Sequence, residues 1–267
     1  MYIFKTEIFG ITIAPSYYGL MYAIGFLTAY IIIKKGLKIS TKKMDDLLIY
    51  SFLGVLLGGR IAYILFYDLT YYLNNPGSLI KVWEGGMSFH GGVIGVILAM
   101  YFFSKKYKVG FLKLADYLCY ALPIGLFFGR IGNYLNKELL GFSNYNGPFA
   151  IYINSVGYFP SPLLEAFLEG IVLFGILHYA KKIKENNNKI FSFKLHKKWY
   201  NVFIPKYDGQ IAALFLIFYS IFRIIVEIFF RVPDTQIGYI FGFLTMGEIL
   251  TFPMLISGIY YFIKLSK

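Results

Sequence analysis

The chain has 267 residues, of which 58% are hydrophobic and only 15% charged, and its formal net charge is +12. A soluble domain is closer to a quarter charged and needs more polar residues to cover its surface. These values argue against a disordered chain and against a soluble nucleic-acid-binding protein. The one cysteine, Cys119, permits no internal disulfide, which argues against a disulfide-rich secreted protein.

Apolar runs of the length needed to cross about 30 Å of hydrocarbon recur along the chain. They predict about seven transmembrane helices, near residues 17–33, 47–66, 88–103, 114–131, 162–180, 210–229 and 243–263. The stretch before the first run is expected to be a short interfacial arm. The predicted fold class is therefore all-α and multi-pass. We expect a single membrane-embedded domain over residues 1–267, with a small external cap inserted at residues 132–161.

The basic residues are distributed unequally between the two sides of this predicted arrangement. Nineteen lysines fall on one set of loops and ends, and four Lys or Arg residues fall on the other. By the positive-inside rule, the N-terminus lies outside and the C-terminus in the cytoplasm. The lysine-rich loops therefore need no nucleic-acid partner, although contact with anionic inner-leaflet lipid stays open as an alternative.

Ionisable residues inside apolar spans are costly and mark functional candidates. With this orientation, nearly all of them lie in the outer half of the bilayer: Arg60, His90, Arg130, Glu165, Glu169, Arg223, Glu227 and Glu248. Asp116 alone lies near an inner end. The outer positions match the depth of lipid headgroups rather than the midplane, where transporters hold their cargo.

The use of arginine rather than lysine inside the apolar runs indicates a phosphate ligand. Only four of the 26 basic residues are Arg, and Arg60, Arg130 and Arg223 fall inside apolar runs. The guanidinium is a planar fork that stays protonated and binds phosphate through two hydrogen bonds. A phosphate-bearing lipid is thus the predicted ligand. The alternative is pairing with a helix carboxylate, since Arg223 and Glu227 are four residues apart on one helix face.

Two further motifs lie at predicted span edges. His90 stands between glycine pairs in GGMSFHGG, and an imidazole titrates near neutrality, so it is a candidate proton acceptor or a structural histidine. The run GRIGNYLNKELLG, residues 129–141, brings Arg130, Asn133 and Glu138 together where a span leaves the membrane. These groups suit a phosphodiester headgroup, or they cap the helix end.

The run GRIGNYLNKELLG resembles the signature of the prolipoprotein diacylglyceryl transferase family. Other blocks resemble that family in the same order: YYGLMYAIGF at 17–26, FLGVLLGGRIAYILFYD at 52–68, VWEGGMSFHGG at 82–92, FRIIVEIFFRVPD at 222–234 and MGEIL at 246–250. Where the family has HPSQLYE, this chain has FPSPLLE, so only Glu165 is carried over there. One residue more than the family pattern separates Glu227 from Arg231.

The resemblance implies a bacterial inner-membrane enzyme with its active site toward the outer leaflet and with no cofactor or metal. Such an enzyme moves the diacylglyceryl group of phosphatidylglycerol to the lipobox cysteine of a prolipoprotein signal peptide, forms a thioether and releases glycerol phosphate. The nucleophile belongs to the substrate, so Cys119 has no required role.

Site residues follow from the matching positions. The expected catalytic residues are His90, Arg130, Glu138, Arg223 and Glu227. His90 is the first choice for the base that takes the thiol proton, with Glu138 or Glu227 as alternatives. Expected phosphatidylglycerol-binding residues are Tyr18, Arg60, Arg130, Asn133, Gly141, Tyr219 and Arg223. The competing functions are a membrane transporter or channel for a small anion, and a lipid-binding scaffold without catalysis.

Overall fold

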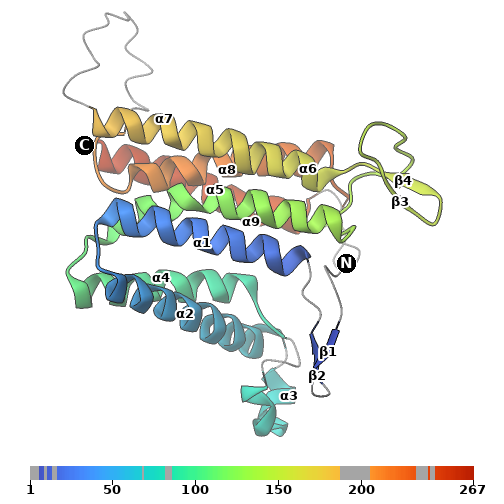
Figure 1. Cartoon of the computed structure of the whole chain (residues 1–267), viewed down its shortest axis with the longest axis horizontal. Coiled ribbons are helices and arrows are strands. Elements are labelled where there is room, and N and C mark those ends of the chain that lie inside the picture. Colours follow the sequence, from blue (N-terminus) through green and yellow to red (C-terminus); the bar gives the residue numbers. More distant parts are fainter. Residues whose placement is uncertain are drawn as a thin grey trace, which may run out of the picture. The chain divides into compact units, whose positions relative to one another are not determined.

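The computed structural model of the chain is mostly helical (Figure 1). It describes residues 6–8, 11–13, 17–67, 69–81, 86–186, 205–232, 240 and 244–267. Some side chains within these ranges, among them those of Tyr18 and His90, lie outside the described set. The long helices are α1 (Tyr17–Leu37), α2 (Thr41–Tyr67), α4 (Phe89–Tyr107), α5 (Phe111–Leu135), α7 (Leu173–Glu185), α8 (Gln210–Phe229) and α9 (Met246–Leu265).

Short elements connect them. These are the helices α3 (Leu69–Asn74) and α6 (Ser161–Glu165), the 3-10 helix η1 (Pro76–Ile80), the π-helical segment η3 (Ala166–Val172), and the strands β1 (Thr6–Ile8), β2 (Ile11–Ile13), β3 (Ile151–Ile153) and β4 (Val156–Tyr158). The strands form two antiparallel hairpins, β1–β2 and β3–β4. The first hairpin lies in the predicted N-terminal arm, and the second lies inside the predicted cap at residues 132–161.

Each predicted span coincides with a helix, so the all-α, multi-pass fold is confirmed. Six described helical stretches are long and apolar enough to cross a membrane: Gly19–Leu37, Thr41–Leu65, Phe111–Leu135, Ser161–Glu185, Gln210–Phe229 and Gly247–Leu265. The remaining predicted span corresponds to α4, whose first two side chains are outside the described set. The count of seven spans and their orientation stay predictions.

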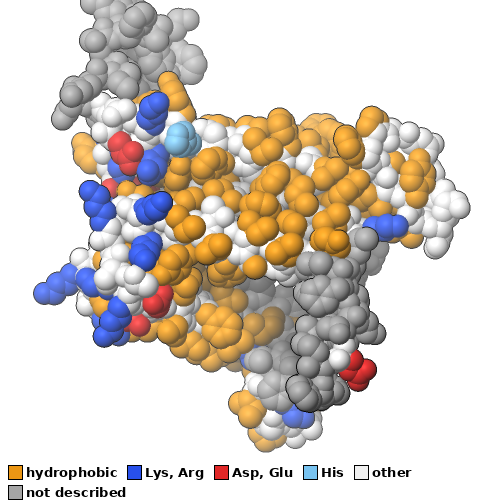
Figure 2. All heavy atoms as spheres, viewed as in Figure 1, with side chains coloured by type: hydrophobic (Ala, Val, Ile, Leu, Met, Phe, Trp, Pro, Cys, Tyr) orange, Lys and Arg blue, Asp and Glu red, His pale blue; other side chains and the backbone are white. Residues whose placement is uncertain are grey.

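The chain divides into two compact units. Unit 1 comprises Met1–Ile33 and Asp116–Lys267, and unit 2 comprises Lys34–Ala115. In unit 1 a buried apolar core joins α5, α7, α8 and α9, and its members include Tyr120, Leu177, Leu214, Ile217 and Phe262. Figure 2 shows apolar side chains along the sides of these helices and basic ones near the end of α7. That distribution fits helices embedded in lipid.

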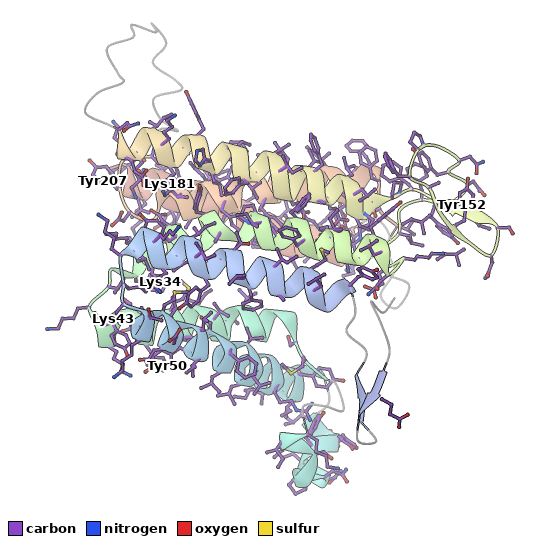
Figure 3. All side chains as sticks on the ribbon, in the orientation of Figure 1. Lys34, Lys43, Tyr50, Tyr152, Lys181 and Tyr207 are labelled. Atoms are coloured by element: carbon purple, nitrogen blue, oxygen red, sulfur yellow. The ribbon has the colours of Figure 1, made fainter. Side chains whose placement is uncertain are left out.

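One end of unit 1 is fixed by a network around Asp116 in α5. Its carboxylate accepts hydrogen bonds from Lys184 Nζ at 2.8 Å, from the Gly209 N–H at 3.0 Å and from the Ala212 N–H at 2.9 Å. Asp116 thus caps the start of α8 and pairs with the end of α7. Lys181 and Tyr207 lie at this end, whereas Tyr152 of the β3–β4 hairpin lies at the opposite end (Figure 3). The lysines at the end of α7 and the β3–β4 hairpin therefore lie at opposite ends of unit 1.

In unit 2, α2 and α4 pack face to face through glycines. A Cβ on Gly58 would collide with the Gly91 carbonyl, and one on Gly95 would collide with the Gly54 carbonyl. Small residues allow two membrane helices to approach this closely. At one end of the pair, Lys106 Nζ donates to Tyr50 Oη at 3.0 Å and Lys43 lies over the Tyr107 ring. The lysines near the start of α2 and the end of α4 therefore lie together at this end.

Candidate active site

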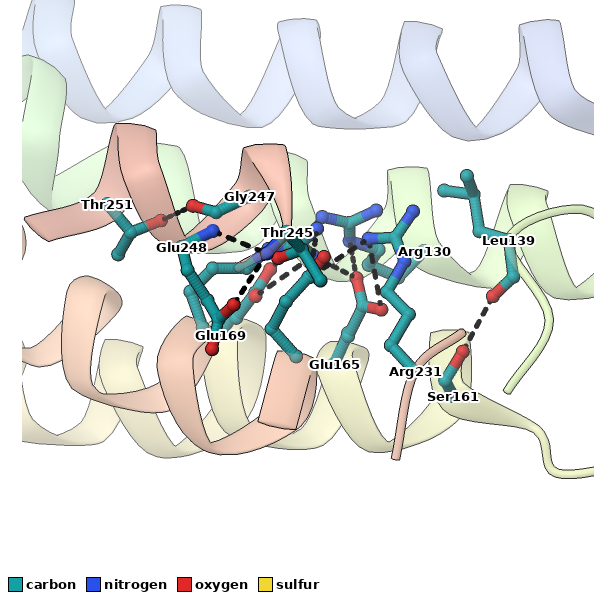
Figure 4. A network of polar contacts seen from close by, with 12 residues as sticks. Arg130, Leu139, Ser161, Glu165, Glu169, Arg231, Thr245, Gly247, Glu248 and Thr251 are labelled. Carbon is teal, nitrogen blue, oxygen red and sulfur yellow. Dashed lines mark hydrogen bonds and ion pairs between the residues drawn. The ribbon is translucent and has the colours of Figure 1, made fainter. Parts of the chain in front are cut away.

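A cluster of buried ionisable side chains lies in unit 1 at the end that carries the β3–β4 hairpin. We call it the Arg–Glu cluster, and its members are Arg130, Glu165, Glu169, Arg223, Glu227 and Arg231. Arg130 comes from α5, the first two glutamates from α6 and η3, and the rest from α8 and the residues after it. Figure 4 shows Arg130, Glu165, Glu169 and Arg231 beside the start of α9. Three cations and three carboxylates meet here.

Glu165 is the centre of the cluster because all three arginines contact it. Arg130 Nε lies 2.8 Å from Glu165 Oε2, Arg223 Nη1 lies 3.0 Å from the same oxygen, and Arg231 Nη1 lies 3.7 Å from Oε1. Glu169 adds contacts of 3.3 Å to Arg130 and 3.8 Å to Arg223. A carboxylate with several cationic partners offsets the cost of burying its charge.

Glu227 closes the other side of the cluster. Its Oε2 lies 2.9 Å from Arg223 Nη2 and 3.9 Å from Arg231 Nη1. The expected alternative, that Arg223 pairs with Glu227, is therefore realised in the structure. Arg223 is held from both sides, by Glu165 and by Glu227.

The arginine side chains are the more exposed members of the cluster. The side chains of Glu165 and Glu169 are 0% exposed, whereas those of Arg130 and Arg223 are 15% and 12% exposed. A guanidinium has five N–H donors, and the ion pairs of Arg130 use Nε and Nη2. Buried carboxylates thus hold the arginines in place while donor groups remain for a ligand. This arrangement suits an anion that approaches from the accessible side.

Arg231 reaches the cluster because of Gly141. These two residues form an antiparallel bridge, and the Gly141 N–H donates to the Phe159 carbonyl at 2.9 Å. A Cβ at Gly141 would collide with the Phe230 carbonyl oxygen. Burial lowers the pKa of the Arg231 guanidinium, and the Arg223 cation lowers it further. A guanidinium nevertheless stays charged at neutral pH.

The signature run forms a tight turn at the end of α5. The Glu138 N–H donates to the Asn133 carbonyl and the Lys137 N–H to the Tyr134 carbonyl, with Lys137 in the left-handed region at φ 57°. This is the Schellman arrangement that ends many helices. Asn133 Nδ2 and Asn136 Nδ2 also donate to the Glu138 carboxylate at 3.1 and 3.3 Å. The expected capping of this helix end is present, and it fixes the Glu138 carboxylate.

Tyr219 stands one turn before Arg223 on α8, and its ring stacks on Phe215. Ser161, at the start of α6, is fully buried and donates to the Leu139 carbonyl at 2.6 Å. That bond ties α6, which carries Glu165, to the end of the signature run. The turn after α5 and the start of α6 therefore position the cluster jointly.

Arg60, in unit 2, is occupied by the backbone of its own unit. Its guanidinium donates to the carbonyls of Ser78 at 2.6 Å, Leu79 at 3.1 Å, and Lys81 and Gly86 at 3.2 Å each. Arg60 also lies over the Tyr72 ring at 5.0 Å. The side chain is 5% exposed. These bonds tie Ser78, Leu79, Lys81 and Gly86 to α2.

Two other predicted site residues, Tyr18 and His90, have side chains outside the described set. Their roles stay predictions. Within the described residues, no group of three or more His, Cys, Asp or Glu side chains is placed to hold a metal ion.

Three members of the cluster are not among the predicted catalytic or binding residues. Glu165 matches the family pattern but has no predicted role, Glu169 stands out only by its depth, and one extra residue precedes Arg231. The available signal was the spacing of Glu165 and Glu169, which are four residues apart in an apolar span like Arg223 and Glu227. Two such pairs of costly residues at the same depth are each other's natural partners.

The model of one protein family, described as prolipoprotein diacylglyceryl transferase, matches residues 6–264. The chain belongs to this family. The phosphatidylglycerol–prolipoprotein diacylglyceryl transferase of Rickettsia bellii (strain OSU 85-389) is 45% identical over 259 residues, which cover 94% of this chain and 91% of the relative. The protein of the same name from Pasteurella multocida (strain Pm70) is 47% identical over 252 residues, covering 91% and 84%.

The expectation of a membrane-embedded bacterial transferase of lipoprotein biosynthesis is thereby confirmed. The resemblance carried by the ordered motif blocks extends over nearly the whole chain. Family membership favours the transferase over the anion transporter or channel and over the non-catalytic scaffold.

Proposed function

We propose that this chain transfers the diacylglyceryl group of phosphatidylglycerol to the cysteine thiol of a prolipoprotein, and that the Arg–Glu cluster binds the lipid phosphate. One observation carries the assignment to the cluster. Arg130 and Arg223 are held by fully buried carboxylates, and both arginine side chains keep some exposure. Guanidinium pairs that are fixed before the ligand arrives bind phosphate at little cost in side-chain order.

The location supports a lipid substrate. Arg130 lies five residues before the end of α5, which is about 8 Å along the helix axis. Glu165 is at the start of the span Ser161–Glu185, and Arg223 is near the end of Gln210–Phe229. All three residues are therefore within a few turns of a membrane boundary. A phospholipid phosphate lies at that depth, with its acyl chains beside the apolar helix surfaces.

The chemistry requires charge stabilisation at the phosphate. The substrate sulfur forms a bond to the glyceryl carbon that carries the phosphate ester oxygen, and the bond between that carbon and oxygen breaks. The electron pair leaves with glycerol phosphate, so a phosphodiester with one negative charge becomes a more negative phosphomonoester. Fixed cations next to the departing oxygen stabilise this change. Arg130 and Arg223 are assigned that role.

The thiol proton needs an acceptor because thiolate is the reactive nucleophile. His90 remains the proposed base. Glu227 is already paired with Arg223 and Arg231, and Glu138 accepts two asparagine hydrogen bonds. Both carboxylates are therefore better suited to orient neighbouring groups than to take a proton. Asn133, Gly141 and Tyr219 are proposed to shape the wall of the phosphate site, and Tyr18 and Arg60 remain proposed contributors to lipid binding.

The test is a transfer assay with purified protein in mixed micelles of detergent and phosphatidylglycerol. A lipobox peptide is the acceptor, and the thioether product is measured by mass spectrometry. Arg130→Ala and Arg223→Ala should each lower turnover at least 100-fold. Lys181→Ala, which removes a cation at the opposite end of unit 1, should keep wild-type turnover. Wild-type turnover in either arginine variant would refute the assignment, and a peptide with Ser in place of Cys should give no product.

A further inference from the structure

The first turn of α9 is held rigidly by its own hydrogen bonds. The Thr245 hydroxyl accepts the Glu248 N–H at 3.2 Å, and the Glu248 carboxylate accepts the Thr245 N–H at 2.7 Å, which makes a complete capping box. Both side chains are buried. The Thr251 hydroxyl adds a bond of 2.6 Å to the Gly247 carbonyl (Figure 4). Because its carboxylate is engaged in the cap, Glu248 is not a free acid of the site.

Gly247 lies in this turn and faces the Glu227 carboxylate directly. A Cβ built on Gly247 would be 2.7 Å from both Cδ and Oε1 of Glu227 and 2.9 Å from its Oε2. The three nearest atoms all belong to that carboxylate. Atoms of real side chains do not approach so closely, so the carboxylate occupies the space that any side chain at position 247 would need.

The start of a helix carries a partial positive charge and favours a nearby anion. Glu227 is therefore held from two directions, by α9 on one side and by Arg223 at 2.9 Å and Arg231 at 3.9 Å on the other. The position of its carboxylate in turn fixes Arg223 Nη2. Gly247 is therefore connected to the proposed phosphate site through two successive contacts. It lies against the Glu227 carboxylate, and that carboxylate contacts Arg223.

We propose that Gly247 is a positioning residue for the transfer reaction: it lets the Glu227 carboxylate sit against α9, and Glu227 then aims Arg223. The inference rests on the proposed function, because it takes Arg223 to bind the phosphate. Gly247 itself touches no reacting atom. The proposal gives a role to the MGEIL block, residues 246–250.

Gly247→Ala is expected to give a folded but slow enzyme. Alanine suits a helix better than glycine does, and the atoms in the way are the end of a flexible side chain rather than backbone. The Glu227 carboxylate should therefore move while the fold persists. Misplacement of a catalytic group by about 1 Å lowers rates by on the order of 100-fold. We expect kcat to fall about 10- to 100-fold, with a smaller change in KM and an unchanged melting temperature.

The deciding experiment combines this change with Glu227→Asp, which withdraws the carboxylate by one methylene group and leaves space for the new methyl group. Gly247→Ala should cost about 10- to 100-fold in kcat in the wild-type background but less than about 3-fold in the Glu227→Asp background. Gly175→Ala is the matched control, because a Cβ at that helical position meets no atom within 4 Å, and it should keep wild-type kcat.

Three results would overturn the inference: wild-type kcat in Gly247→Ala, an equal cost of that change in both backgrounds, or loss of folded protein. The last counts against it because the carboxylate, not the fold, is expected to yield. Failure here is distinguishable from failure of the proposed function. Wild-type activity in Arg130→Ala and Arg223→Ala would refute the assignment of the phosphate site itself. Wild-type activity in Gly247→Ala alone would refute only the positioning role of Gly247.

Discussion

The conservative change Glu165→Gln tests whether the Arg–Glu cluster is a charge-compensated network. It keeps the shape of the side chain and one acceptor oxygen but removes the charge that faces Arg130, Arg223 and Arg231. Loss of one partner of a buried ion pair costs about 3–5 kcal/mol, and the retained acceptor argues for the lower end. At about 2–4 °C per kcal/mol, a cost of about 3 kcal/mol lowers the melting temperature by about 6–12 °C.

The control is the same substitution at an exposed pair. Glu185 lies 2.9 Å from Lys181, and its side chain is 55% exposed. Such a pair contributes about 0–1 kcal/mol, so Glu185→Gln should melt within about 4 °C of the wild type. Melting is followed by circular dichroism in matched detergent micelles. Equal melting temperatures for the two variants would refute the view that Glu165 compensates three cations.

The same variant reports on phosphate binding. Removal of one carboxylate leaves three arginines against two glutamates, so an anionic lipid should replace part of the lost charge. Phosphatidylglycerol added to the micelles should therefore raise the melting temperature of Glu165→Gln more than that of the wild type, whereas phosphatidylcholine should not. An equal gain in both proteins would mean that the phosphate binds elsewhere.

Further outcomes are expected in the transfer assay. Arg223→Lys keeps the charge but cannot bridge Glu165 and Glu227. The loss of one charged hydrogen bond, about 1.5–3 kcal/mol, should lower kcat/KM about 10- to 150-fold. Wild-type kcat/KM would contradict this expectation. Gly141→Ala should displace Arg231, lower turnover about 10-fold, and add nothing to Arg231→Ala; additive losses would refute the shared path. If His90 is the base, the kcat of the wild type should decline below about pH 6.5, where an imidazole becomes protonated. His90→Gln should lower kcat by about 100-fold or more and abolish this decline. An unchanged pH profile in the variant would exclude the role.

Hydropathy was sufficient to predict where the helices lie, because crossing a bilayer imposes length and apolarity on each one. It also predicted that the ionisable residues of the cluster lie at a similar depth in the membrane. Burying a charge in lipid costs free energy, so such residues mark functional positions. It could not predict which faces meet. In a soluble helix the polar stripe marks the outside, whereas here both the lipid-facing and the protein-facing sides are apolar. The partnership of Glu165 with Arg130, Arg223 and Arg231 therefore had to come from the structure.

Arg60 illustrates the same limit. An arginine in an apolar span predicts an anionic partner from the sequence alone. In the structure its guanidinium donates to four backbone carbonyls, those of Ser78, Leu79, Lys81 and Gly86. Every residue has a backbone carbonyl oxygen, so the sequence does not indicate which carbonyls will accept hydrogen bonds from Arg60. Two of the four belong to η1, and their approach to Arg60 depends on tertiary folding, which local patterns do not encode.

The π-helical segment η3 sets the rotational phase between the two ends of one long helix. Glu165 meets Arg130 and Lys184 meets Asp116, and both partners lie on α5, about four turns apart and so on one face. Glu165 and Lys184 are 19 residues apart, and an unbroken α-helix would place them about a quarter-turn out of register. A π turn encloses one extra residue and removes that excess, which leaves five whole turns. An unbroken α-helix with the same number of residues would thus make the two ion pairs mutually exclusive, whereas deletion of one residue from η3 would restore about five whole turns between Glu165 and Lys184.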